Sequence, residues 1–318
     1  MKPKAFVGLL AGGIIVYSGL WYSMGLNAER QIIERLNHLR ESGATVRHSP
    51  PELSGFPYRL EITLKDVSIK ASNFNWQAKS SSATAIGHVW SPDHWFLRLR
   101  RTEITAADGA VSISSYDTLS SIRWGEDRTL HIGIDLSSSK AGGAVLGSQG
   151  IEAEKAELHL IIPAADHESS KSLLSPLVFK GALRVAKTRG QSADYPALDR
   201  GEVLFALHGA GLNTWSQHAL AEWRDAGGTL EITAASIHWG RSELDGNASL
   251  SLDGAFRPLG AATLTLKNAD PMLRNFKKLG LLSSQPSQDN GIVSVMAQSG
   301  KLTANGKVIA KLKSIAPR

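Results

Sequence analysis

The sequence contains no cysteine among its 318 residues. Disulfide bonds, thiolate metal sites, iron–sulfur clusters and thiol nucleophiles are therefore excluded together. Because cysteine-free proteins occur in both oxidising and reducing compartments, this absence does not indicate a location. The net charge of +6 at pH 7 suits an anionic membrane surface or acidic ligands. No DNA-binding or RNA-binding motif accompanies the basic residues, so we expect no nucleic-acid partner.

Motifs of familiar catalytic sites are also missing. The sequence has no G-x-S-x-G nucleophile elbow, P-loop or dinucleotide fingerprint, and its ten histidines lack H-E-x-x-H and H-x-H spacing. Residues 87–95 are the least ordinary stretch, because Asp93 stands next to His94 and could serve proton transfer. A turn with aromatic flanks is the simpler interpretation. We therefore predict no catalytic residue, no cofactor and no metal ion, and we expect that the protein is not an enzyme.

Charged residues are absent from residues 5–26, which follow Lys2 and Lys4. This stretch is long enough to cross a hydrocarbon core of roughly 30 Å, and it is longer than the ~7–15 apolar residues of a signal peptide. Aromatic residues gather near its far end, where they favour a membrane interface. We therefore expect residues 1–27 to form a cytoplasmic tip and a transmembrane anchor. The expected anchor residues are Ala5, Leu9, Leu10, Ile14, Ile15, Val16, Tyr17, Trp21 and Tyr22.

Two alternatives remain open for this segment. Ser23 and Gly25 have the small-x-small spacing that a signal peptidase accepts, so a cleaved signal peptide is one of them. Orientation is the other, because basic residues lie on both sides of the span. A short basic start, an apolar run and a long following domain favour an N-terminus in the cytoplasm. Residues 28–43 are predicted to form a juxtamembrane helix that ends at Gly43.

From residue 44 to residue 318 the hydrophobic period changes from helical to alternating. The cleanest alternating run is Leu130, Ile132, Ile134 and Leu136. Such runs are typical of half-buried antiparallel strands. In the first long run the apolar parity switches after residue 64, which predicts a β-bulge near Asp66. We expect an α+β fold that is mainly β, with a long antiparallel, curved sheet and a few short helices.

Turn and helix signals divide the β region. The hairpin dipeptides are Asp245-Gly246, Asp253-Gly254 and Asn305-Gly306. Short helices are predicted at residues 166–175, at residues 213–225 with Asn213 as the N-cap, and from Asp270 onward. Residues 60–63 recur at residues 230–233 as Leu-Glu-Ile-Thr. One interpretation of this repeat is that the domain contains two similar sheet halves that meet near residues 186–200. The other is a chance similarity between short strands.

Several segments together resemble a known family. Residues 54–61 read Ser-Gly-Phe-Pro-Tyr-Arg-Leu-Glu, a Trp-Gly pair ends a later strand, and residues 244–253 follow a Leu-Asp-Gly-x-x-x-Leu-x-Leu-Asp rhythm. From about residue 40 to the end, the chain resembles the uncharacterised bacterial family catalogued as domain of unknown function 2125, common in alphaproteobacteria. The residues of this likeness are Gly55, Phe56, Pro57, Tyr58, Arg59, Trp239, Gly240, Asp245, Gly246 and Asp253.

The resemblance implies an envelope protein with an N-terminal anchor or signal, and no established activity. At the level of fold, the pattern also looks like AsmA-type envelope proteins, whose long curved sheets have an apolar groove implicated in lipid handling. The expected location is therefore the bacterial inner membrane, with the main domain in the periplasm. Membrane lipid is the expected partner. It surrounds the anchor, and it is also the expected ligand of an apolar groove in the sheet. A scaffold for envelope protein partners and an envelope hydrolase are the alternative functions.

Overall fold

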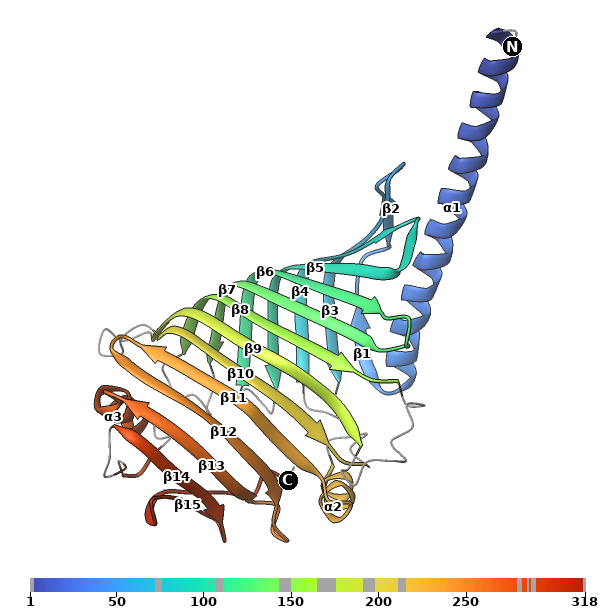
Figure 1. Ribbon diagram of the computed structural model, residues 1–318. Helices are drawn as coiled ribbons and strands as arrows, with labels where there is room; N and C mark the ends of the chain where they lie inside the picture. Colours follow the sequence, from blue (N-terminus) through green and yellow to red (C-terminus); the bar gives the residue numbers. More distant parts are fainter. Residues whose placement is uncertain are drawn as a thin grey trace. The chain divides into compact units, whose positions relative to one another are not determined.

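The computed structural model describes most of the chain and divides it into two compact units, residues 1–124 and 125–318 (Figure 1). The described residues are 3–71, 76–106, 111–142, 150–164, 176–190, 198–210, 216–278, 282–284, 286 and 290–316, with side chains from residue 11 onward. Residues 186–200, where the sequence suggested a meeting of two halves, lie within the second unit. The two units are described separately below.

The first unit consists of one long helix and an antiparallel sheet. Its elements are α1 (Pro3–Glu41), β1 (Ala44–Arg47), β2 (Glu52–Ser54), β3 (Arg59–Ala71), β4 (Trp76–His88), β5 (Ser91–Ala106) and β6 (Val111–Trp124). The strand order is β1-β3-β4-β5-β6, and β2 pairs separately with β3. The helix lies beside β1, β2 and β3 (Figure 1).

The second unit is an antiparallel meander with two short helices. Its elements are β7 (Leu130–Gly142), β8 (Ile151–Ile162), β9 (Leu177–Gly190), β10 (Leu198–His208), α2 (Gln217–Asp225), β11 (Thr229–Trp239), β12 (Ser242–Leu252), β13 (Pro258–Lys267), α3 (Asp270–Lys278), β14 (Gly291–Gln298), β15 (Lys301–Ala304) and β16 (Lys307–Lys311). Each strand pairs with the next strand along the chain. The mainly β, antiparallel class predicted from the alternating runs is therefore confirmed.

The N-terminal helix is a single element. The expected anchor and the expected juxtamembrane helix form one continuous helix, α1, and the chain turns at Gly43, which has a φ of 92°. Among the residues from 11 onward, whose side chains the structure describes, none of the helices combines the length and the apolar character that crossing a membrane requires.

Single residues in the left-handed backbone conformation interrupt the long strands. They are Asp66 in β3, Arg101 in β5, Ser138 in β7 and Lys187 in β9, with φ between 47° and 51°. The parity switch predicted near Asp66 is therefore present, but the predicted bulge is wrong. A bulge adds a residue to one strand, whereas the β3–β4 register is the same on both sides of Asp66. The left-handed φ turns the following side chains to the other face without a change of register.

Small hydroxyl side chains are buried next to these positions in the first unit. Ser80, Thr102, Ser115 and Thr118 are each less than 9% exposed. The Ser80 hydroxyl lies within hydrogen-bond distance of two carbonyl oxygens, 2.9 Å from that of Ser82 and 2.8 Å from that of Arg100. Carbonyl groups near an interruption of the ladder need such partners, because an unpaired buried polar group is costly. Thr102 and Ser115 are register partners, so two of these hydroxyl side chains lie next to each other on β5 and β6.

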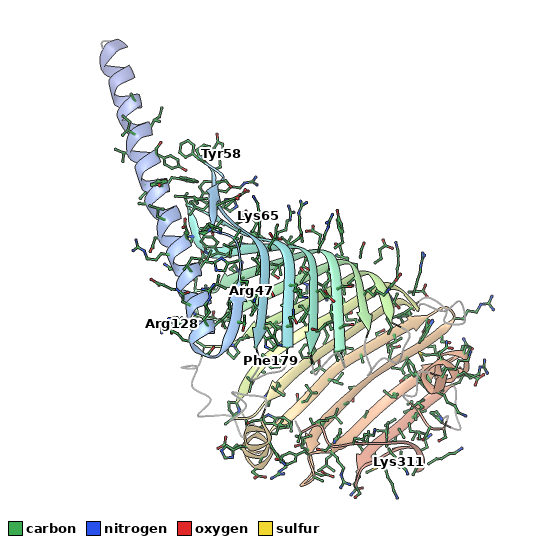
Figure 2. All side chains as sticks on the ribbon, turned by 180° about the vertical axis from the view of Figure 1, so that it is seen from behind. Arg47, Tyr58, Lys65, Arg128, Phe179 and Lys311 are labelled. Atoms are coloured by element: carbon green, nitrogen blue, oxygen red, sulfur yellow. The ribbon has the colours of Figure 1, made fainter. Side chains whose placement is uncertain are left out.

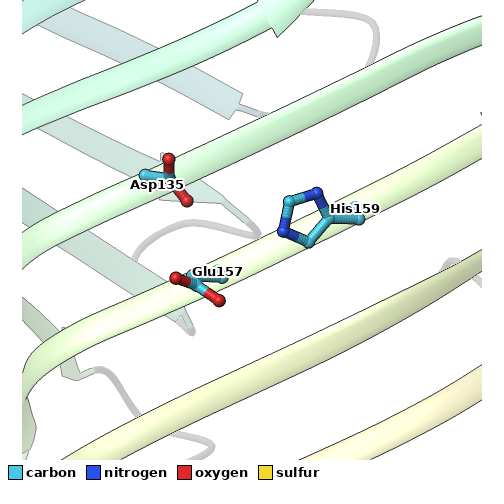
Figure 3. A group of neighbouring side chains, drawn as sticks. All are labelled: Asp135, Glu157 and His159. Carbon is cyan, nitrogen blue, oxygen red and sulfur yellow. The ribbon is translucent and has the colours of Figure 1, made fainter.

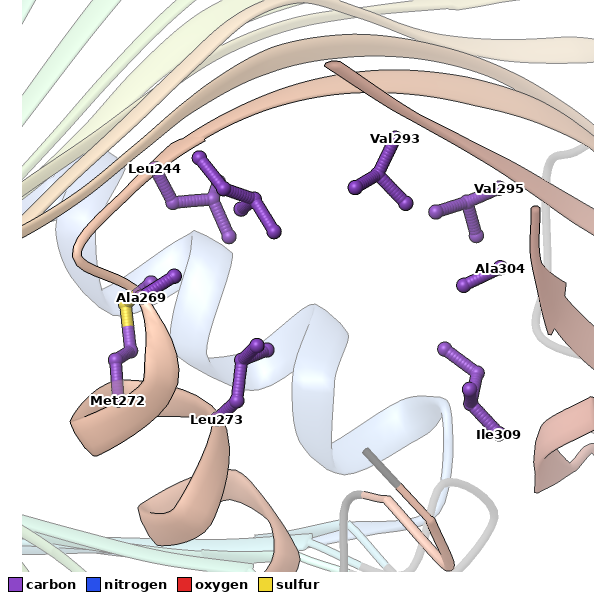
Figure 4. Close-up of a cluster of buried hydrophobic side chains, with 9 residues drawn as sticks. Leu244, Ala269, Met272, Leu273, Val293, Val295, Ala304 and Ile309 are labelled. Atoms are coloured by element: carbon purple, nitrogen blue, oxygen red, sulfur yellow. The ribbon is translucent and has the colours of Figure 1, made fainter. Parts of the chain in front are cut away.

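Two buried apolar clusters form the core of the second unit. The first lies under α3 and is shown in Figure 4. Its buried members are Leu244, Leu266, Ala269, Met272, Leu273, Val293, Val295, Ala304 and Ile309. The second lies under α2 and joins Leu207, Leu220, Trp223 and Leu252. Each short helix therefore covers one part of the apolar sheet face.

Two of the three predicted short helices are confirmed. Helix α2 is capped by Ser216, whose hydroxyl accepts a hydrogen bond from the backbone N–H of Ala219, so the predicted cap at Asn213 is wrong. Asn213 lies outside the described residues, as does the predicted helix at residues 166–175. Helix α3 begins at Asp270, as predicted, and its carboxylate pairs with Arg274 one turn later.

The left-handed position at Asp66 leads to a stability prediction. Asp66→Val should lower the free energy of unfolding by about 1–2 kcal/mol, because a β-branched side chain is strongly disfavoured at positive φ. Asp66→Gly should change it by less than about 0.5 kcal/mol, since glycine adopts this φ readily. Chemical denaturation followed by circular dichroism measures both. The matched control is Lys70→Val, at an exposed position of the same strand; equal destabilisation by both valine variants contradicts the backbone argument.

Candidate functional site

The apolar face of β7–β10 is a partly uncovered apolar surface that the alternating runs create. Register partners bring side chains of neighbouring strands into rows, as where Ile134 lies opposite Leu158 and Leu158 opposite Leu183. Leu183 is 41% exposed, and its neighbours in these rows are neither fully buried nor fully exposed. The members are Leu130, Ile132, Ile134, Leu136, Leu158, Leu160, Ile162, Leu183, Val185 and Val203.

Coverage of this face differs from that of the C-terminal strands. Helix α3 packs on β12–β16, and α2 covers only the end of β9 and β10 near Phe179 and Leu207. Within the described residues, neither helix contributes to a buried cluster with Ile134, Leu158 or Leu183. Burying a leucine or isoleucine side chain fully is worth about 1.5–3 kcal/mol. Leu183 and its half-buried neighbours are therefore only partly removed from water.

An aromatic pair closes one end of this face. The rings of Phe179 and Phe205 meet edge to face with centroids 6.2 Å apart. Gly181 makes room for this pair, because a Cβ at this position would lie 2.9 Å from the Phe205 ring and 2.5 Å from the His159 carbonyl oxygen. Phe179 also contacts the cluster under α2. The two rings therefore separate the packed end of the face from its half-exposed part.

The opposite face of the same strands is polar and contains a group that the sequence did not reveal. Asp135 on β7 and Glu157 and His159 on β8 place their ligand atoms within 4.8 Å of one another (Figure 3). The only sequence signal is the Glu-x-His spacing, which puts two side chains on one strand face. Asp135 joins them through the register, since it is the partner of Glu157.

One carboxylate of this group, that of Glu157, already has a cationic partner on its own strand. Lys155 forms an ion pair with Glu157, and its hydrogen bond holds the pKa of the Glu157 carboxyl below the ordinary value against an opposing effect of burial. The same pair raises the pKa of Lys155. On the next strand, Arg184 pairs with Glu202 at 2.7 Å. Charges of both signs therefore alternate across the strands, which is the expected composition of a solvated sheet face.

Asp93 and His94, the two residues that suggested proton transfer, both follow the turn at the start of β5 and contact different partners. Residues 89–90 form the turn between β4 and β5, as predicted. Asp93 accepts a hydrogen bond from the Ser91 hydroxyl at 3.1 Å, while the His94 ring packs on Phe96 with centroids 4.4 Å apart. Each side chain therefore has its own structural partner.

The family-like segment at residues 55–59 forms the tip of the β2–β3 hairpin and lies against α1. The Arg59 amide donates to the Gly55 carbonyl, which closes the turn, and Gly55 has a φ of 98°. Phe56 packs edge to face on Trp21, with ring centroids 5.4 Å apart. The Tyr17 hydroxyl donates to the carbonyl of Pro57, and the Trp21 indole to that of Arg59. Tyr58 is exposed at the tip (Figure 2).

The expected anchor residues lie on α1 with unequal exposure. Trp21 is 7% exposed because the hairpin covers it, whereas Ile15 is 71% exposed. The other uncovered anchor residues are Ile14, Val16 and Tyr22. The side chains of Ala5, Leu9 and Leu10 lie outside the described residues.

The later family-like residues have structural roles in the second unit. Trp239 ends β11 and packs on Phe276 of α3, with centroids 6.0 Å apart. The Gly240 amide donates to the Asp199 carboxylate. The prediction of a hairpin turn at Asp245-Gly246 is wrong, because both residues lie inside β12. Glycine is needed there for close approach, since a Cβ would lie 2.5 Å from the Thr263 carbonyl oxygen.

Two other predicted turns are confirmed. Asn305 and Gly306 form a two-residue turn between β15 and β16, and both have positive φ. Asp253 begins the turn between β12 and β13, where its carboxylate accepts hydrogen bonds from the Ala255 amide and from the amide and guanidinium of Arg257. Burial alone raises the pKa of Asp253, but these hydrogen bonds outweigh it, so the pKa lies below its ordinary value.

Asp253 should therefore stabilise the second unit in a pH-dependent manner. Asp253→Asn should lower the free energy of unfolding at pH 7 by about 1.5–3 kcal/mol, the usual contribution of hydrogen bonds to a charged group. Because the folded pKa is lowered, this contribution is complete above the unfolded value of about 3.9 and disappears as the pH falls through the folded pKa. Urea unfolding at several pH values tests both points. Asp245→Asn, at an exposed position of β12, is the control; an effect of Asp253→Asn that stays constant down to pH 2 contradicts the argument.

Comparison with known proteins adds one finding to this geometry. The chain matches no curated protein and no solved structure. One family model matches residues 21–310, most of the chain, and its description is "Uncharacterized protein conserved in bacteria (DUF2125)". The match includes the hairpin tip, the half-exposed β7–β10 face and the Asp253 turn. The chain therefore belongs to the bacterial family DUF2125.

Proposed function

We propose that this chain is a non-enzymatic protein of the bacterial cell envelope that binds or guides a lipid or another amphiphile along its apolar sheet face. Residues 5–26 anchor it as a single span in the inner membrane, and the main domain faces the periplasm. The observation that supports the ligand is the half-exposed apolar face of β7–β10, where Leu183 is 41% exposed. An apolar face of this kind is stabilised by a helix, a second sheet or a ligand.

An acyl chain suits this face better than a polar metabolite does. The rows of leucine, isoleucine and valine offer contacts over several neighbouring strands but few hydrogen-bond groups. Each methylene group removed from water contributes about 0.8 kcal/mol, so a chain of several methylenes gains enough to bind. The curvature of the sheet that the sequence predicts also belongs to the proposal.

The uncovered surface of α1 supports the anchor. Ile15 and Val16 are more than 70% exposed, although they belong to an uncharged stretch. Apolar side chains on a helix are stable in this arrangement when hydrocarbon surrounds them. A long domain after a short basic start is translocated with little regard to its own charge, which favours a periplasmic location.

A scaffold for protein partners is the second candidate, and one specific observation favours it. Strands β14 and β16 expose Ile292 (68%), Met296 (49%) and Val308 (43%). Met296 is the register partner of Thr303, which in turn faces Val308, so two of these side chains belong to one row. Such a patch suits an apolar contact on another protein.

Lipid crosslinking tests the ligand proposal. Membranes containing the full chain are supplied with a phospholipid that bears a diazirine on its acyl chain, and crosslinked peptides are identified by mass spectrometry. Adducts are expected on β7–β9 as well as on α1. Ile134→Glu should reduce the β7–β9 adducts roughly tenfold, equivalent to the loss of about two buried methylenes.

The control for this experiment is Ser137→Glu, at an exposed position on the opposite face of β7. It should leave the adducts unchanged, and circular dichroism should show that both variants are folded. Adducts confined to α1 in the native chain overturn the groove while leaving the anchor intact. Capture of a stoichiometric protein partner through β14 and β16, without lipid on β7–β9, favours the scaffold.

A further inference from the structure

The tip of the β2–β3 hairpin meets α1 inside the uncharged stretch of the helix, not beyond its end. Phe56 contacts Trp21 and Tyr17, with ring centroids 5.4 and 6.3 Å apart. The Trp21 indole donates to the Arg59 carbonyl oxygen at 3.1 Å. These contacts join the hairpin to the helix at two successive turns. The tip therefore lies beside residues 17–21 of the helix.

Close packing below the tip continues the same contact. Gly25 is buried, and a Cβ there would lie 2.6 Å from a methyl group of Leu53. Leu53 belongs to β2, so the hairpin strand and the helix touch at the end of the uncharged stretch. The hairpin therefore runs along α1 from Gly25 back toward Tyr17.

The length of the uncharged stretch places the tip at a definite depth. At 1.5 Å per residue, residues 5–26 extend about 33 Å, close to the hydrocarbon thickness of a bilayer. Trp21 and Tyr17 then lie roughly 8 and 14 Å inside the end of this stretch. A helix that spans the bilayer with these residues must draw the attached hairpin tip below the membrane surface.

The chemistry of the tip suits this position. Residues 55–58 contain no charge, and their side chains are open to the surroundings, with Phe56 52% and Tyr58 72% exposed. The adjacent charge on Arg59 is paired with Glu61 at 2.6 Å. Tyrosine and tryptophan favour the boundary between lipid headgroups and acyl chains. Exposed aromatic rings at an uncharged tip are costly in water and stable at that boundary.

We propose that the turn at residues 55–58 is inserted into the bilayer beside α1, between the headgroup–acyl boundary and the depth of Tyr17, as a second membrane contact of the domain. The ligand is the lipid surface itself, recognised by Phe56 and Tyr58. This inference rests on the proposed membrane anchor. It also gives the aromatic residues of the family-like motif a role outside the protein core. Two contacts side by side restrict rotation of the first unit relative to the membrane plane.

Site-directed fluorescence tests the insertion, and the absence of native cysteine makes single-cysteine variants straightforward. The full chain is reconstituted into vesicles of phosphatidylethanolamine and phosphatidylglycerol, with an environment-sensitive fluorophore at one cysteine. Tyr58→Cys reports on the tip and Ile15→Cys on the helix. Thr45→Cys is the matched control, because it is exposed on β1 at the opposite end of the same helix. Nitroxide-labelled lipids then quench the fluorophores that lie in the bilayer.

Quenching at Tyr58→Cys is expected to exceed that at Thr45→Cys at least threefold, with the emission of the Tyr58→Cys label shifted to the blue. Ile15→Cys should be quenched as well. If Ile15→Cys is quenched while Tyr58→Cys behaves like Thr45→Cys, the insertion is wrong and the anchor stands. If none of the three labels is quenched, the anchor is wrong and the insertion falls with it. Circular dichroism of each labelled variant confirms that it is folded.

Discussion

An antiparallel strand with alternating apolar and polar side chains creates a surface that cannot be left fully in water, and this constraint governs the molecule. On the C-terminal strands, α3 covers the apolar surface, and its Met272 and Leu273 pack over β12–β16. Helix α2 covers the apolar surface at the end of β9 and β10, where Trp223 is buried and its indole donates to the His208 carbonyl. The described helices do not cover the apolar surface of β7 and β8. The half-exposed rows there are the physical basis of the proposed lipid function.

The left-handed residues let the apolar pattern change parity within a long strand. In β3, Leu64 is buried and Asp66 turns the chain, so Val67 faces the same side although it stands three residues later. Similar positions in β5, β7 and β9 have the same effect without altering the pairing of neighbours. Because the register is preserved, the apolar face continues across the interruption. The buried hydroxyls of Ser80 and Ser115 accompany the change, since they lie next to it and bond nearby carbonyl groups.

The contact between the hairpin tip and α1 connects the proposed membrane anchor with the sheet. Trp21 is buried by Phe56, so a residue of the apolar stretch belongs at the same time to the folded domain. An anchor that packs on its domain transmits the orientation of the membrane to the sheet, whereas a flexible tether does not. In this arrangement the proposed membrane contact of Tyr58 and the proposed lipid face depend on separate elements. Each can therefore be altered without the other.

The sequence by itself determined the mainly β class, the uncharged N-terminal helix, α3, the Asn305 turn and the family. Each follows from a local pattern: alternation, length without charge, a helix start at Asp-Pro, a turn dipeptide whose φ values few other residues adopt, or a short motif. Tertiary structure decided the rest. Asp245-Gly246 carries the same turn signal as Asp253-Gly254, but contact with Thr263 on the next strand keeps it inside β12. Asp135, Glu157 and His159 come together only through the register of two strands. The packing of α2 and α3 decided which part of the apolar face is covered. This packing depends on contacts between residues that are distant in the chain, so the local sequence does not reveal it.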